Sequence, residues 1–154
     1  MSKPTFEDFI ELCKLNTENA YVPELLNITK DSDCIYSSGI IMPYEHVLDI
    51  YTIRLEIAEE NKKLSENEIL DSKSCVNNIS KVKSENIGIL NLATENNFYM
   101  LFYEPKENRI IGIIKFLKTE SLNDVENYND ETIQKGFSSK AQKYSKGKLI
   151  KEWK

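Results

Sequence analysis

The hydrophobic pattern of the chain changes near residue 87, and this change limits the folds that it can form. Before it, apolar residues recur at helical spacing; after it, they gather in three short runs at 87–92, 98–104 and 109–117. Such runs predict strands, and Pro105–Asn108 has the composition of a hairpin loop. The second and third runs are almost continuously apolar, so we expect both faces of their sheet to be covered. The pattern predicts a mainly antiparallel sheet of three or more strands over about 87–117.

Two capping boxes predict the starts of helices ahead of the sheet segment. Thr5 is followed three residues later by Asp8, and Ser65 by Glu68; in such a pair each side chain bonds the other residue's backbone N–H. Pro23 marks the first turn of a short helix between them. The helix after Thr5 carries an apolar stripe, and we expect it to cover three residues of the sheet: Ile111, Ile113 and Phe116.

Two stretches between these helices are less regular. The segments 31–33 and 37–39 have loop composition. The stretch 43–64 fits a helical stripe, although 53–57 alternates between apolar and charged residues as a strand does. Its length favours a helix, because strands of about 20 residues are rare.

A last helix is expected from Asp130 to about Tyr144. Four residues of this stretch are spaced as one helix face: Ile133, Phe137, Ala141 and Tyr144. N-terminal helices, a mainly antiparallel sheet and a C-terminal helix make an α+β fold. With 154 residues, 40% of them apolar, the chain has the size and composition of one globular domain, 1–154.

The sequence predicts a cytoplasmic protein. Met1–Pro4 leads directly into a charged amphipathic stretch, whereas a secretory signal needs about 7–15 consecutive apolar residues. No apolar run approaches the roughly 18 residues of a membrane-spanning helix. The cysteines Cys13, Cys34 and Cys75 show no pairing pattern, which is typical of reduced thiols. Abundant Lys, Asn and Ile favour an AT-rich genome or mobile element as the source, and we expect a bacterial one.

Residues that common catalytic and metal sites require are sparse. The five glycines never come within the spacing of a phosphate-binding loop. Three scattered cysteines and the single histidine, His46, do not make a zinc site. The cysteines beside apolar stripes are expected to act as small buried residues, and His46 would need a nucleophile and an orienting carboxylate to catalyse a reaction. We therefore expect no catalytic residue, no metal and no cofactor, and a protein that is not an enzyme.

One segment is similar to part of a known enzyme family. Residues 97–116, a strand, a charged turn and a returning strand, resemble the central hairpin of the acyl-CoA-dependent N-acetyltransferases. That family has a glycine-rich pyrophosphate loop after the hairpin, whereas this sequence has Thr119–Gln134 there, without a glycine. The chain therefore lacks the segment with which that family binds its cofactor.

Charge is distributed unevenly along the chain. The C-terminal segment 135–154 holds seven lysines and one glutamate, a net charge of +6, whereas 1–134 carries a net charge of −11. Two acidic groups stand out, one between Thr119 and Gln134 and one between Glu56 and Asp71. An acidic face steers a basic partner and rejects others. We predict that the partner contacts Glu120, Asp124, Glu126, Tyr128, Asp130 and Glu131 of the first group, and Glu59, Glu60 and Glu66 of the second.

These features predict a small cytosolic protein that binds and neutralises another protein, of the toxin-immunity or inhibitor type. A nuclease holds phosphates in a basic cleft, and an acidic protein can cover that cleft. The alternative is a nucleic-acid-associated protein that uses the segment 135–154, where lysines lie beside aromatic residues on which bases can stack. The net charge of −5 disfavours nucleic-acid binding. An enzyme centred on His46 is the third hypothesis, and no membrane partner is expected.

Overall fold

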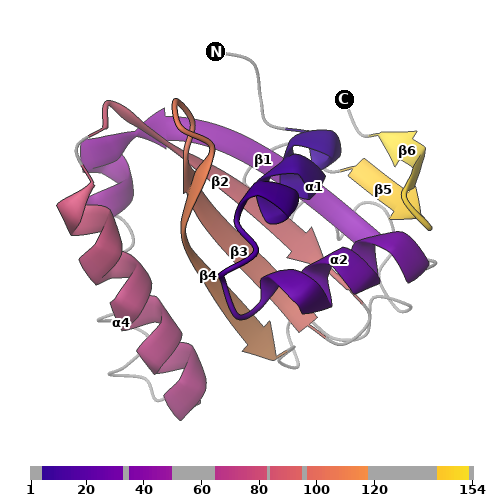
Figure 1. Cartoon of the computed structure of the whole chain (residues 1–154), viewed down its shortest axis with the longest axis horizontal. Helices are drawn as coiled ribbons and strands as arrows, with labels where there is room; N and C mark the ends of the chain where they lie inside the picture. The colour runs from indigo at the N-terminus through magenta and orange to yellow at the C-terminus, as the bar shows by residue number, and fades with distance from the viewer. Residues whose placement is uncertain are drawn as a thin grey trace.

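The structure is a computed structural model of the chain, and it describes residues 5–32, 35–49, 65–82, 84–94, 97–117 and 142–152. Its helices are α1 (Phe6–Leu15), α2 (Val22–Asp31) and α4 (Glu66–Lys81), with a further helical stretch at 44–49. Its strands are β1 (Ile35–Pro43), β2 (Asn86–Ala93), β3 (Asn97–Glu104), β4 (Arg109–Leu117), β5 (Gln142–Ser145) and β6 (Lys148–Glu152). The strands form one six-stranded antiparallel sheet, in the order β4-β3-β2-β1-β5-β6 (Figure 1).

The predicted α+β class is confirmed. The apolar runs at 87–92, 98–104 and 109–117 correspond to β2, β3 and β4. Pro105–Asn108 forms the turn between β3 and β4, as its composition indicated.

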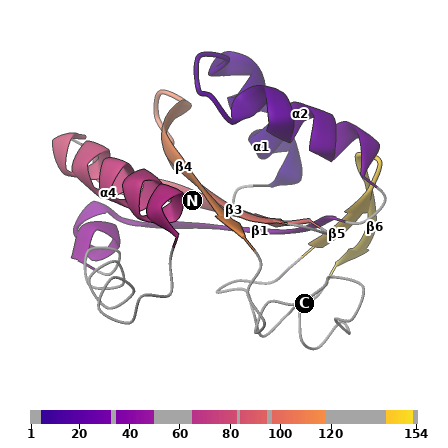
Figure 2. The same ribbon diagram turned by 90° about the horizontal axis from the view of Figure 1, so that it is seen from below.

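Both faces of the sheet are covered, as the continuous apolar runs predicted. Leu90 and Leu92 of β2 pack under α1 and α2 in one core. Their neighbours Ile87 and Ile89 lie in a second core with Ile79 of α4, because successive side chains of a strand point to opposite faces. Figure 2 shows α1 and α2 together above the sheet.

The expectation that α1 covers three residues of β4 is correct for Ile113 and wrong for Ile111 and Phe116. Ile113 lies in the core under α1, whereas Ile111 and Phe116 pack in the core of α4. A register shift explains Ile111: Phe102 pairs with Gly112 and Tyr103 with Ile110, so Ile111 is the extra residue of a bulge. A β-bulge interrupts the alternation of side chains between the two faces of the sheet. The side chain of the extra residue can therefore lie on the face opposite to the one that simple alternation gives.

The predicted helix starts are confirmed. Thr5 N–H donates to Asp8 Oδ2 at 2.7 Å, and Asp8 N–H donates to Thr5 Oγ1 at 3.2 Å. Ser65 and Glu68 form the same reciprocal pair at the start of α4, at 3.3 and 3.2 Å. Pro23 lies in the first turn of α2, where its missing N–H costs no helical hydrogen bond.

The loop predicted at 37–39 is wrong, because these residues lie in β1. Ser37 and Ser38 are 1% and 2% exposed, and β1 pairs with β2 on one side and β5 on the other. Small polar residues have the composition of a loop, but here the two neighbouring strands satisfy their backbone groups. The other predicted loop, 31–33, is wrong at Asp31, which is the last residue of α2; Ser32 follows the helix, and residue 33 lies outside the described residues.

The predicted C-terminal helix is wrong in the part that the structure describes. Tyr144 lies in β5 and stacks on Phe6 of α1, with ring centroids 3.9 Å apart. Lys146 and Gly147 have φ of 48° and 83°, and two successive residues with positive φ form the tight turn that joins β5 to β6. The signal for a hairpin was the Lys146–Gly147 pair, which lies between Tyr144 and Leu149 with one polar residue on each side. The remainder of the prediction, at 130–141, lies outside the described residues.

The stretch 43–64 is described only at its start. Residues 44–49 are helical, and Val47 is buried in the core of α4; 50–64 lies outside the described residues. Within the part of the chain that the structure describes, no helix is long and apolar enough to span a membrane.

Candidate functional site

Of the residues predicted to bind a partner, the structure describes Glu66, which is exposed at the start of α4. Glu68 and Asp71 of the same acidic group are engaged within the protein: Glu68 closes the capping box of α4, and Asp71 accepts a hydrogen bond from the Tyr21 hydroxyl at 2.5 Å. The other predicted residues lie outside the described part: Glu59, Glu60, Glu120, Asp124, Glu126, Tyr128, Asp130 and Glu131.

The described residues with reactive side chains do not gather in one place. His46 is exposed, in the helical stretch 44–49. Cys13 and Cys75 are buried in different cores, and burial raises the pKa of each thiol to about 12. Because the thiolate is the nucleophile, neither thiol is activated at neutral pH. Among the described residues, no group of three or more His, Cys, Asp or Glu side chains is placed to hold a metal ion.

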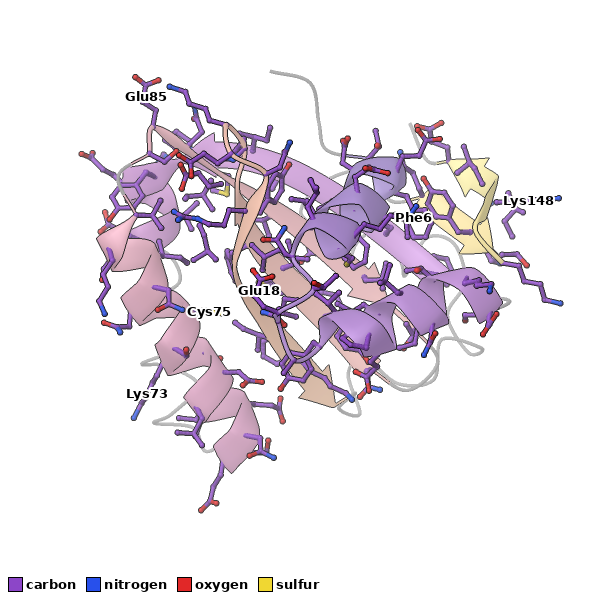
Figure 3. All side chains as sticks on the ribbon, in the orientation of Figure 1. Phe6, Glu18, Lys73, Cys75, Glu85 and Lys148 are labelled. Carbon is purple, nitrogen blue, oxygen red and sulfur yellow. The ribbon has the colours of Figure 1, made fainter. Side chains whose placement is uncertain are left out.

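A groove of about 620 Å³ opens between α1, α2 and the β5–β6 turn. Phe6, Ile10 and Leu26 form its apolar floor. Phe6 and Ile10 are four residues apart, so they lie one above the other on the side of α1 that faces α2 and the turn. Figure 3 labels Phe6 at the end of α1 that lies nearest β5 and β6.

The three elements around the groove are held to one another. The Phe6 ring stacks on Tyr144 of β5, as described above. Lys146 N–H donates to the carbonyl oxygen of Ser32, just after α2, at 2.7 Å. Gly147 of the same turn lies close to α2, since a Cβ on it would be 3.8 Å from the carbonyl oxygen of Thr29. The groove is therefore formed by packed structure rather than by separate surface side chains.

The two walls of the groove differ in charge. Glu7 and Glu11 are exposed on the α1 wall, about 6 Å apart along the helix axis by helical rise. Lys30 and Lys146 line the opposite wall, at the end of α2 and in the turn. Lys14, in the last turn of α1, also lines the α1 wall. An apolar floor with a charged rim is the usual make-up of a protein-binding surface.

A second polar cluster ties α2 to the rest of the protein. Glu24 of α2 accepts hydrogen bonds from the Tyr99 hydroxyl and from Lys115 Nζ, both at 2.8 Å. Burial and the hydrogen bond to Asp71 raise the pKa of Tyr21 to about 12. Tyr21 thus stays a neutral donor, which suits a structural link between the start of α2 and α4 better than proton transfer. The cluster holds the α2 wall of the groove in place.

Replacing Glu24 by glutamine should lower stability at neutral pH and matter less in acid. Burial raises the pKa of Glu24, but the hydrogen bonds from Lys115 and Tyr99 and the lysine charge outweigh it, so the pKa lies below the ordinary 4.5. A carboxylate of lowered pKa stabilises the fold above its unfolded-state pKa, and this contribution is lost as the pH falls through the folded-state value.

Urea denaturation of wild type and Glu24→Gln at about pH 7 and about pH 3.5 tests this, because the first pH lies above the ordinary carboxyl pKa and the second lies below it, where the contribution is already falling. The difference in unfolding free energy should shrink in acid. Glu107→Gln, at an exposed position of the β3–β4 turn, is the control and should change little. A difference for Glu24→Gln that stays constant over this range would contradict the bonded, ionised state of Glu24.

Most of the groove was not predicted from the sequence. On the predicted first helix, Glu7 and Glu11 form an acidic row, and Phe6 and Ile10 form an apolar row next to it. This pattern is visible in the sequence and could have indicated the α1 wall. Lys146 becomes part of the groove only through the tertiary structure, which places the β5–β6 turn beside the end of α2. Comparisons with family models, with curated proteins and with solved structures found no match to this chain.

Proposed function

We propose that the chain is a small bacterial cytoplasmic protein that binds and neutralises another protein, of the toxin-immunity or inhibitor type, and that the partner docks in the groove between α1 and α2. The observation that carries the proposal is the combination of an apolar floor with two exposed carboxylates, Glu7 and Glu11, on the α1 wall of one preformed groove. Apolar burial supplies most of the affinity of such interfaces, while charge selects the partner.

The charge of the chain supports a basic partner. Glu7 and Glu11 border the apolar floor, and residues 1–134 carry a net charge of −11. A basic surface, such as the phosphate-binding cleft of a nuclease, would be attracted over a long range and then contact the α1 wall. The acidic residues predicted between Thr119 and Gln134 remain part of this proposal as a second contact with the same partner.

The rival, nucleic-acid binding through the basic C-terminal segment, has less support. The β5–β6 hairpin does carry Lys143, Lys146, Lys148 and Lys151. However, Tyr144 is 7% exposed and stacked on Phe6, so its ring is not available as a platform for bases. A described aromatic residue that the rival needs is therefore already engaged in the core.

Charge reversal on the α1 wall should abolish neutralisation. To find the partner, each protein encoded by a neighbouring gene is expressed in a host, once alone and once together with this chain. We expect one of these proteins to be toxic alone, and to be harmless when it forms a 1:1 complex with the chain. Glu7→Lys with Glu11→Lys should then weaken the complex by about a hundredfold, mainly through slower association at low salt. The dissociation constant and association rate, measured by surface plasmon resonance, report the effect.

The matched control is Glu18→Lys with Glu107→Lys, which changes charge equally at exposed positions outside the groove and should preserve protection. Reversing Glu7 in the first turn of α1 costs about 0.3–1 kcal/mol of helix stability, so urea denaturation must show that the variant is folded. Equal loss in both variants would mean that general charge, not the groove, binds the partner. If no neighbouring protein is neutralised, the proposed function is wrong.

A further inference from the structure

The two outer strands of the sheet differ in how their edges are occupied. At the β4 edge, the Asn16 side chain accepts from Ile110 N–H and donates to the Asn108 carbonyl, both at 3.0 Å. Asn78 of α4 donates to the Ile111 carbonyl at 3.3 Å, and α4 packs along β4. An edge strand whose backbone groups bind side chains and a helix is protected from pairing with another chain.

The β6 edge is not covered in this way by any described residue. Each of its five residues is exposed, and Leu149 and Ile150 are 52% and 55% exposed. Within the described part of the chain, β6 is the last strand of the sheet (Figure 1). An exposed edge strand with apolar side chains is a surface on which an extended segment can add a strand.

The pairing of β5 with β6 places the two lysines of β6 on one face of the sheet, and Leu149 together with Glu152 on the other. Leu149 pairs with Tyr144, Lys151 with Lys143 and Lys148 with Ser145, and the register shifts between Lys143 and Tyr144. Paired residues share a face, and Ser145 is on the face of Lys143 because it follows Tyr144. The bulge at Ile150 thus brings Lys148 and Lys151 to one face, although they are three residues apart, and leaves Leu149 on the other.

We infer that β6 binds an extended acidic segment of another protein as a seventh strand. Carboxylate and apolar side chains would alternate along such a segment. The carboxylates would lie on the face of Lys148, and the apolar side chains on the face of Leu149. Its backbone would supply the hydrogen bonds, and the alternation would supply selectivity.

The probe is a capped eight-residue peptide of alternating Glu and Val. Its control has the same composition in blocks, four Glu followed by four Val, and a second control replaces Glu by Lys. Amide chemical shifts of residues 148–152 followed by NMR should move with the alternating Glu–Val peptide, which should bind about tenfold more tightly than the block peptide. Raising the salt concentration from about 50 to 500 mM should weaken it.

Variants locate the site. Lys148 points away from the body of the protein (Figure 3), so Lys148→Glu should not disturb the core and should weaken binding by about tenfold; Lys148→Ala should have a smaller effect in the same direction. Lys106→Glu, in the exposed β3–β4 turn beside the other sheet edge, should leave binding unchanged. Equal binding of the alternating and block peptides, shifts outside β6, or self-association through β6 in sedimentation would each overturn the inference.

Discussion

Replacing Phe9 by alanine is expected to destabilise the protein by about 3–5 kcal/mol, the range for removing a buried phenylalanine. Phe9 is 0% exposed in the core that α1 and α2 form with the sheet, and its ring lies parallel to that of Phe6 at 6.3 Å. Removing the ring leaves a cavity between two layers that are each held by other contacts, so the site cannot simply collapse. Urea denaturation followed by circular dichroism measures the loss.

Leu15→Ala is the control on the same helix. Leu15 is 63% exposed, so its truncation should change the unfolding free energy by less than about 0.5 kcal/mol. A loss below about 1 kcal/mol for Phe9→Ala would mean that the ring is not a core residue and that α1 does not pack on the sheet as described.

Gly112→Ala is the second change expected to have a large effect, about 1–3 kcal/mol of destabilisation from overpacking. A Cβ at this position of β4 would lie 2.4 Å from Cys75 Sγ of α4, closer than two such atoms can approach. Either the Cys75 side chain must rotate within the second core, or α4 or β4 must move. The same denaturation experiment measures the cost.

Cys75→Ala tests whether the clash is the cause. Combined with Gly112→Ala it removes the sulfur, and the nearest remaining atoms of residue 75 lie at 3.5 Å, an ordinary contact. The double variant should therefore be more stable than the sum of the two single changes predicts, a coupling expected only between residues in contact. Strict additivity would show that α4 does not lie against Gly112.

Prediction from the sequence succeeded where the cause of a structure lies within a few residues. Thr5 with Asp8 and Ser65 with Glu68 close their helices by bonds three residues apart, and Pro105–Asn108 separates two apolar runs that pair with each other. It failed at Ser37 and Ser38, whose place in β1 depends on partners more than 50 residues away in β2. Their composition favours a loop, and only the neighbouring strands override it.

Tyr144 illustrates the same limit at the candidate site. Its spacing from Ala141 and Phe137 fits a helix face, yet it stacks on Phe6, near the opposite end of the chain. That contact places the β5–β6 turn beside α2 and so completes the groove. The pattern of apolar residues says which positions seek burial; it does not say which distant surface will bury them.

The sequence by itself determined the α+β class, the starts of α1 and α4 and the β3–β4 hairpin, because local hydrogen bonds and the period of apolar residues specify them. Only the tertiary structure decided that β1 joins the sheet, that a bulge moves Ile111 to the α4 face, and that acids of α1 and lysines of α2 and the β5–β6 turn border one groove. These depend on contacts between residues far apart in the chain. Their free energy is gained only when the whole sheet has formed.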